Sequence, residues 1–176
     1  MKATALIAVA SVLAILLAGC SQPVDGSGSP APANPGGDTE VLAKGEIHEE
    51  YRRAIDNFPE PMPEGFAYLD ALGPEYEPTD GFMEKGAGEV AVAYTWLCAW
   101  ENSYINSFDS GDTESADGAV AMLAKWKFLP NSAFYMSDPE DSWTKAVLEP
   151  AQLGDPSGVR ADLSGTCGGF KFDRTK

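Results

Sequence analysis

The sequence predicts a mainly α-helical domain of about four helices arranged around one buried central helix. Apolar side chains recur at steps of three and four between Gly88 and Phe108, the spacing that places them on one helical face. Similar periodicity appears on both sides of this stretch. Ser137 and Glu140, with Pro139 between them, have the spacing of a helix start further along. These three observations favour a helical fold over a sheet.

The central helix is expected to be buried on several sides. Val90, Leu97 and Tyr104 form one apolar stripe, and Trp96 and Trp100 belong to the neighbouring face. The longest nearly uninterrupted apolar run, 90–100, is about half of the roughly 20 residues needed to cross a bilayer. The helix is therefore predicted to form the core and to end near Phe108.

An earlier helix is predicted from Thr39 or Glu46 to Asn57, where Pro59 stops it. The following stretch, 60–86, has no sustained period, and we expect a long irregular acidic wrap with one short helical turn or edge strand in it. A loop of this length in a compact domain needs anchors. The expected anchors, which could alternatively form a binding surface for sugar or peptide, are the aromatic residues Phe66, Tyr68, Tyr76 and Phe82.

Two more helices are predicted after the central one. The third begins at a cap formed by Asp112 or Thr113 and should lie antiparallel to the central helix. The fourth begins near Ser137 or Asp138, and Pro150 ends or kinks it. Its expected inward residues are Trp143, Ala146, Val147 and Leu148. From Leu153 onward, glycine and proline are frequent enough to predict a coil.

The N-terminal residues have the pattern of a targeting peptide. Lys2 precedes an apolar run, and the small residues Ala18 and Gly19 precede Cys20. Leu17-Ala18-Gly19-Cys20 resembles the lipobox of bacterial lipoproteins, in which the cysteine receives a diacylglyceryl group and becomes the first mature residue. The alternative is an ordinary secretory signal with an incidental cysteine. The resemblance predicts a signal peptide over 1–19 and lipidation of Cys20.

The resemblance also implies a location outside the cytoplasm, with the membrane as a partner through the lipid anchor. Two acyl chains anchor a protein stably where one is marginal. Residues 20–38 are rich in proline, glycine and serine and predict a disordered tether. A single helical globular domain is then expected over 39–176.

Lipidation of Cys20 leaves Cys98 and Cys167 as the remaining thiols of the three cysteines. Disulfides persist outside the cytoplasm, so we predict a bridge between them that ties the C-terminal coil to the central helix. The alternative is that one of them is a reactive thiol. A reactive thiol needs a base nearby, and the chain has one histidine, His48.

The motifs of common enzymes are missing from the sequence. With one histidine and no G-x-S-x-G or nucleotide-binding loop, no catalytic residue, cofactor or metal is predicted. The acidic turn at 109–117 does not have the spacing of a calcium loop. Trp96, Trp100 and Glu101 remain candidate binding residues, and Glu101 is the carboxylate closest to the core.

The formal net charge of −15 makes nucleic acid an unfavourable partner. We therefore expect a non-enzymatic binding or accessory module of the cell envelope, with an envelope protein or glycan as partner. One alternative is a carboxylate-dependent hydrolase of cell-wall glycan, which requires two inward carboxylates 5 to 10 Å apart, as is typical of glycosidases. Another is a domain active only in a complex, which should expose an aromatic patch from the wrap.

Overall fold

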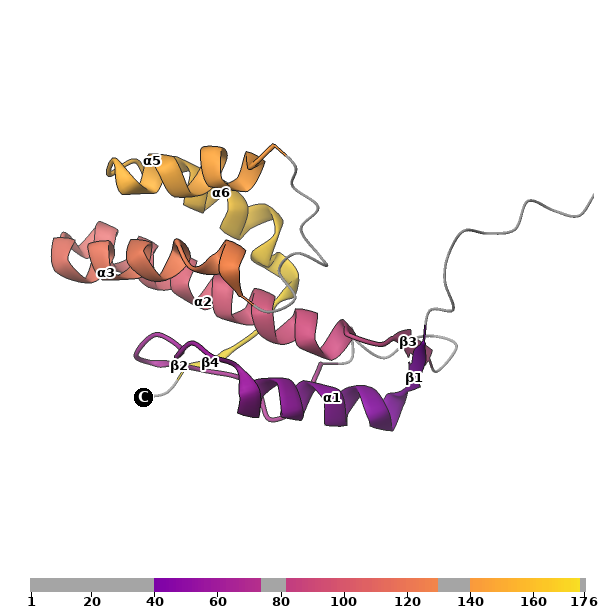
Figure 1. Cartoon of the computed structure of the whole chain (residues 1–176). Helices are drawn as coiled ribbons and strands as arrows, with labels where there is room; N and C mark the ends of the chain where they lie inside the picture. Colours follow the sequence, from indigo (N-terminus) through magenta and orange to yellow (C-terminus); the bar gives the residue numbers. More distant parts are fainter. Residues whose placement is uncertain (1–39, 74–81, 130–139, 175–176) are drawn as a thin grey trace, which may run out of the picture. The chain divides into compact units, whose positions relative to one another are not determined.

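The computed structural model describes residues 40–73, 82–129 and 140–174, and Figure 1 shows their arrangement. This part of the chain is mainly helical, as predicted. Its α-helices are α1 (Lys44–Asn57), α2 (Ala87–Ser110), α3 (Thr113–Leu123), α5 (Glu149–Gln152) and α6 (Ser157–Gly165). Shorter turns are the 3-10 helices η2 (Trp126–Phe128) and η4 (Cys167–Gly169) and the π-helical turn η3 (Thr144–Leu148). The strands are β1 (Val41–Ala43), β2 (Phe66–Ala67), β3 (Phe82–Glu84) and β4 (Asp173–Arg174).

The long helix α2 is the buried centre of this part of the chain, as the apolar pattern predicts. It packs against α1, α3 and α6. Trp96, Leu97 and Tyr104 belong to one buried cluster, which α3, η2, η3, α5 and α6 complete. Ala91 and Val92 belong to a second cluster, which α1 completes. Because α2 contributes to both clusters, it joins the two halves of the core (Figure 1).

The start of α2 is held by a buried carboxyl group from α1. Oε1 of Glu50 accepts a hydrogen bond of 2.8 Å from the Gly86 N–H, and Oε2 accepts one of 2.8 Å from the Gly88 N–H. These N–H groups belong to the first turn of the helix, where no carbonyl of α2 can reach them. Gly88 also lets α1 approach closely, since a Cβ there would lie 2.7 Å from the backbone nitrogen of Tyr51.

The end of α2 and the start of α3 follow the sequence prediction. Gly111 ends α2 with a φ of 75°, in the left-handed region that glycine adopts readily. The side chain of Asp112 then accepts a hydrogen bond of 3.1 Å from the Ser115 N–H and caps α3. The short connection places α3 beside α2, and the α3 residues Ala116, Val120 and Leu123 are buried.

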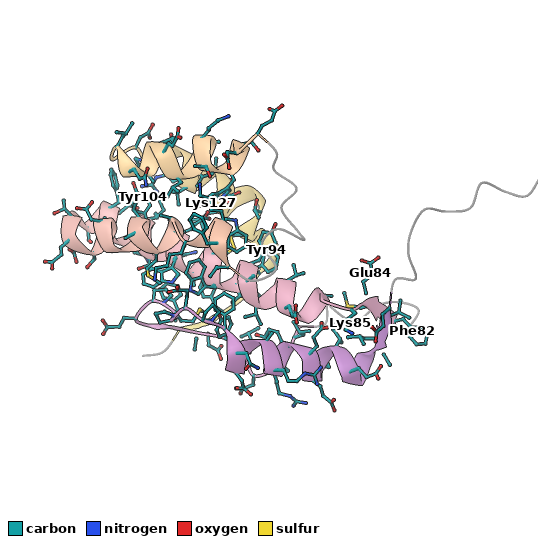
Figure 2. All side chains as sticks on the ribbon, in the orientation of Figure 1. Phe82, Glu84, Lys85, Tyr94, Tyr104 and Lys127 are labelled. Atoms are coloured by element: carbon teal, nitrogen blue, oxygen red, sulfur yellow. A yellow bond between two sulfur atoms is a disulfide. The ribbon has the colours of Figure 1, made fainter. Side chains whose placement is uncertain are left out.

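The wrap contains the short strand β2, which agrees with the edge strand that the sequence left open as an alternative, and the strand β3, which was not predicted. Strand β1 pairs antiparallel with β3, with Leu42 opposite Met83, and β2 pairs antiparallel with β4. Phe66 and Tyr68 anchor the wrap through edge contacts with the rings of Phe172 and Phe58. The prediction that Phe82 is an anchor in the core is wrong, because its side chain is 54% exposed. Phe82, labelled in Figure 2, lies on the β1–β3 ribbon. Tyr76 lies outside the described residues.

The predicted C-terminal coil is wrong, because α6 occupies its first half. The glycines and prolines that suggested a coil lie mostly at the helix ends. Asp155 accepts a hydrogen bond of 2.9 Å from the Ser157 N–H at the first turn. Val159 is fully buried and Leu163, one turn later, packs against the same cluster. Burial of this apolar face overrides the weak helix propensity of the segment.

The fourth predicted helix also differs from the expectation. Its start signal at 137–139 lies outside the described residues. Val147 and Leu148 are buried as predicted, but Ala146 is exposed. Pro150 does not end the helix, because the chain widens into the π-turn η3 and continues as α5. Pro150 has no N–H, so it cannot donate the usual helix hydrogen bond to the Ala146 carbonyl. Gly158 of α6 packs against this carbonyl, and a Cβ at Gly158 would lie only 2.1 Å from its oxygen.

We predict that Gly88→Ala lowers the free energy of unfolding by about 1–3 kcal/mol, because its Cβ would displace the α1 backbone. Gly118→Ala is the matched control: Gly118 lies inside α3 with no heavy atom within 4 Å of an added Cβ. This control should raise the free energy by about 0.5–1 kcal/mol. Urea denaturation checks both values, and equal effects of the two substitutions would contradict the close contact of α1 with α2.

Candidate functional site

The predicted bridge between Cys98 and Cys167 is present, and it joins the middle of α2 to η4. The two Cα atoms lie 5.6 Å apart and the cysteines are separated by 69 residues. Closing a loop of this length stabilises a fold by about 4 kcal/mol in the chain-entropy model. Cys98 is fully buried, whereas Cys167 is 8% exposed. The bridge therefore attaches the C-terminal segment to the most buried part of α2.

Glu101 lies one helical turn after Cys98, and its side chain is fully buried. Its Oε2 lies 3.4 Å from Sγ of Cys167. A disulfide sulfur carries no hydrogen, so it cannot donate to this oxygen. Among the described residues, no donor is directed at Oε1 either. An ionised Glu101 would thus be a buried charge without compensation, which is costly.

Asp162 of α6 is the carboxyl group that interacts with Glu101. Two donors hold Asp162 in place. The Trp143 Nε1–H donates to Oδ2 at 2.9 Å, and the Thr166 hydroxyl donates to Oδ1 at 2.6 Å. These two hydrogen bonds fix the Asp162 carboxyl group in position on α6.

The pKa of Glu101 follows from this environment. Burial raises the pKa from 4.5 to about 10, and the charge of Asp162 and the hydrogen bond between the two carboxyl groups act in the same direction. Burial, and then the charge of Asp162, also raises the pKa of Tyr94 on the same helix. At neutral pH, Glu101 is consequently a neutral, protonated acid.

This carboxyl pair does not have the geometry of a glycosidase site. Retaining and inverting enzymes hold their two carboxyl groups about 5–5.5 Å or 6.5–9.5 Å apart, with the substrate between them. Glu101 is fully buried and therefore offers a substrate no exposed surface between it and Asp162. The pair can hold one proton beside a disulfide.

The two tryptophans predicted as binding residues have internal partners. The indole N–H groups of Trp96 and Trp100 both donate to the carbonyl of Pro61, at 2.9 and 3.0 Å. Trp96 is fully buried and Trp100 partly so. These bonds hold the proline-rich start of the wrap against α2. A role of Trp96, Trp100 and Glu101 in binding a ligand stays a prediction.

Two recesses open on the described surface. A groove of about 360 Å³ is lined by the second half of α1 and by Lys85 and Glu89 at the start of α2 or just before it. Its charged residues Glu50, Arg53, Lys85 and Glu89 lie beside the uncharged Ala54, Asn57, Phe58 and Pro59. Lys85, labelled in Figure 2, pairs with Glu40 at 2.7 Å. A more open hollow of about 490 Å³ is bordered by α2, α6 and the segment after η4, and Cys167 forms part of its wall. Cys167, one of the two cysteines of the disulfide, therefore borders this second recess.

The described residues contain no group of three histidine, cysteine, aspartate or glutamate side chains placed to hold a metal ion. In the acidic turn, Asp112 has the capping role described above, and its hydrogen bonds with Ser115 lower the pKa of its carboxyl group. Within the same described part, no helix combines the length and the apolar character needed to cross a membrane.

Sequence reasoning identified Glu101 and both cysteines but missed Asp162, Trp143 and Thr166 as parts of one site. The signal lay in the predicted disulfide itself. Asp162 and Thr166 immediately precede Cys167, so the bridge brings them to the turn of α2 that carries Glu101. Predicting a coil after Leu153 concealed this relation, because Asp162 and Thr166 lie on one face only in a helix.

We predict that Glu101→Gln stabilises the protein increasingly as pH rises above 5. Between the unfolded pKa near 4.5 and the folded pKa of about 10, the folded state retains a proton that the unfolded state has lost, so stability falls with rising pH. The variant escapes this loss of about 1.4 kcal/mol per pH unit, with about 4 kcal/mol at pH 7.5 as an upper limit.

Urea denaturation of wild type and variant at pH 5 to 8 measures this effect. Glu149→Gln, at an exposed carboxyl group of α5, is the matched control and should not change the pH dependence. A stability difference between wild type and Glu101→Gln that is the same at pH 5 and pH 8 would contradict the protonated, buried state of Glu101.

Comparison of the chain with protein-family models, with curated proteins and with solved structures finds no match. The site consists of the disulfide that joins α2 to η4, the buried protonated carboxyl group of Glu101 beside it, and the carboxyl group of Asp162 with its two donors.

Proposed function

We propose that this chain is a lipid-anchored lipoprotein outside the cytoplasm, and that its helical domain is a binding or accessory module of the cell envelope. The observation that carries the proposal is the Cys98–Cys167 disulfide. It accounts for two of the three cysteines and leaves Cys20, at the lipobox-like Leu17-Ala18-Gly19-Cys20, for lipidation. Disulfides of this kind persist in oxidising compartments, which fits export from the cytoplasm.

The tether and the charge of the chain support the same role. Residues 20–38 are rich in proline, glycine and serine, a composition typical of flexible spacers. Anionic lipid headgroups repel a chain with a net charge of −15, so the anchor and not the domain surface would hold it at the membrane. The domain would then face away from the lipid and be available to an envelope partner.

The groove beside α1 is the binding surface that best fits a partner. It has cationic side chains, Arg53 and Lys85, as well as the anionic Glu89. Lys85 is exposed and its pKa is raised by its hydrogen bond with Glu40. Because Ala54, Phe58 and Pro59 also line the groove, it combines apolar residues with charged ones, as protein interfaces commonly do.

The anchor is tested by replacing the lipidated residue. Cells expressing wild type or Cys20→Ser are labelled with a fatty-acid analogue and fractionated. Wild type should carry the label and remain in the membrane fraction. Cys20→Ser should carry no label, and no protein of mature size should be found in its membrane fraction. Cys167→Ser, which removes the disulfide but not the lipobox-like sequence, should keep the label. Unlabelled wild type in the soluble fraction would contradict lipidation.

The binding role is tested by capture of partners on the detergent-solubilised wild-type protein. We expect an envelope protein or glycan to be retained, and Lys85→Glu to reduce its recovery several-fold, because the groove loses an exposed cation. Lys127→Glu, at an exposed position of η2 outside the groove, is the charge-matched control. Hydrolysis of cell-wall glycan by the purified protein, with no retained partner, would favour the hydrolase alternative instead.

A further inference from the structure

The surroundings of the disulfide differ on its two sides. Cys98 has no exposed surface and lies within α2. Cys167 retains 8% exposure and forms part of the wall of the 490 Å³ hollow. A thiolate that enters the hollow would therefore meet Cys167, whereas Cys98 offers no exposed surface for attack.

A protonated carboxyl group lies beside the bond on its inner side. Oε2 of Glu101 is 3.4 Å from Sγ of Cys167, and Glu101 is one turn from Cys98 on the same helix. A disulfide that only stabilises the fold does not need this group, since an apolar side chain would fill the space without the cost of burying a polar one. Glu101 remains without an obvious structural role.

We propose that the Cys98–Cys167 bond is a thiol–disulfide exchange site, in which a partner thiolate enters through the hollow and Glu101 supplies the proton required by the departing sulfur. This inference goes beyond the proposed envelope role and does not depend on the lipid anchor. It names the partner chemistry as a small-molecule or protein thiol.

The exchange balances without an added oxidant. The partner thiolate forms a bond to Sγ of Cys167 while the Cys167–Cys98 bond breaks, and the bonding electron pair leaves with Sγ of Cys98. The Glu101 proton passes to that sulfur. The products are a mixed disulfide on Cys167, a Cys98 thiol and a Glu101 carboxylate. In reverse, Glu101 takes the proton back, and the Cys98 thiolate attacks Cys167 and releases the partner thiolate.

The buried position of Cys98 explains why a proton donor is needed. A thiolate buried among apolar side chains is unfavourable, because burial raises the pKa of a thiol. The titratable group that interacts with Glu101 is Asp162 of α6, and Tyr94 of α2 also interacts with Asp162.

The charge near the entrance indicates which thiols react best. Arg160 lines the hollow and pairs with Asp109, so the cation is partly compensated. The chain as a whole carries −15 and repels anionic partners. A neutral or cationic thiol is therefore the expected partner, and 2-mercaptoethanol is the neutral probe for the test.

The experiment follows reduction of the natively exported protein by 2-mercaptoethanol, using wild type, Glu101→Gln and the control Glu149→Gln. We expect the wild-type rate to rise linearly with thiolate concentration and to change little in low urea, as for attack on the folded protein. Glu101→Gln should react at least about tenfold more slowly, within the range lost with a general acid, and Glu149→Gln at the wild-type rate. The thiolate-normalised rate should fall toward pH 10 only where Glu101 is present.

Glu101→Gln is also expected to be more stable, so it would be reduced more slowly even if the thiol attacked only unfolded protein. The dependence of the rate on urea distinguishes the two routes. If wild-type reduction rises with urea in proportion to the unfolded fraction, the bond is attacked only after unfolding and the proposal is wrong. Equal rates for Glu101→Gln and Glu149→Gln would also overturn it. Acid quenching, alkylation and peptide mass analysis should place the thiol adduct on Cys167, and an adduct on Cys98 would contradict the route through the hollow.

Discussion

The burial of α2 on several sides is the constraint on which the rest of the structure depends. From Gly88 to Tyr104 most of its residues are inaccessible to water, so no single neighbour can cover it. The helix α1 covers one side, α3 another, and α6 is held against it by the disulfide. The carbonyl of Pro61 receives the two indole N–H groups of α2 that would otherwise be left without acceptors. Each neighbouring element therefore packs where it buries one face of α2.

Two buried glutamates meet this constraint in opposite ways. Glu50 accepts hydrogen bonds from two backbone N–H groups at the start of α2. The N–H groups thereby gain acceptors, and both oxygens of the buried carboxyl group gain donors. Glu101 has no donor directed at it and keeps its proton instead. The first arrangement stabilises a helix junction. The second lowers stability at neutral pH and places an acid beside a sulfur–sulfur bond, which is the combination expected of a group retained for chemistry.

The helical class, the extent of α2, the cap of α3 and the Cys98–Cys167 bridge could be predicted because each depends on local pattern or on composition. The apolar period identified α2, and Asp112 is a favourable cap. With Cys20 expected to be lipidated, Cys98 and Cys167 were the two cysteines left to pair. The π-turn and α6 could not be predicted in this way, since tertiary burial of Val147 and Val159 outweighs nearby proline and glycine. Asp162 was missed because its role depends on a contact with α2 that no local pattern contains.

The central claim is that α2 is the last element to open and that the remaining elements depend on it. Native-state hydrogen exchange of the oxidised protein tests this directly, because it reports the opening free energy of each backbone amide. The account predicts that amides between Ala91 and Tyr104 exchange slowest, with an opening free energy equal to that of global unfolding. Slower exchange in α1 or α3, or opening of α2 while its neighbours stay protected, would contradict it.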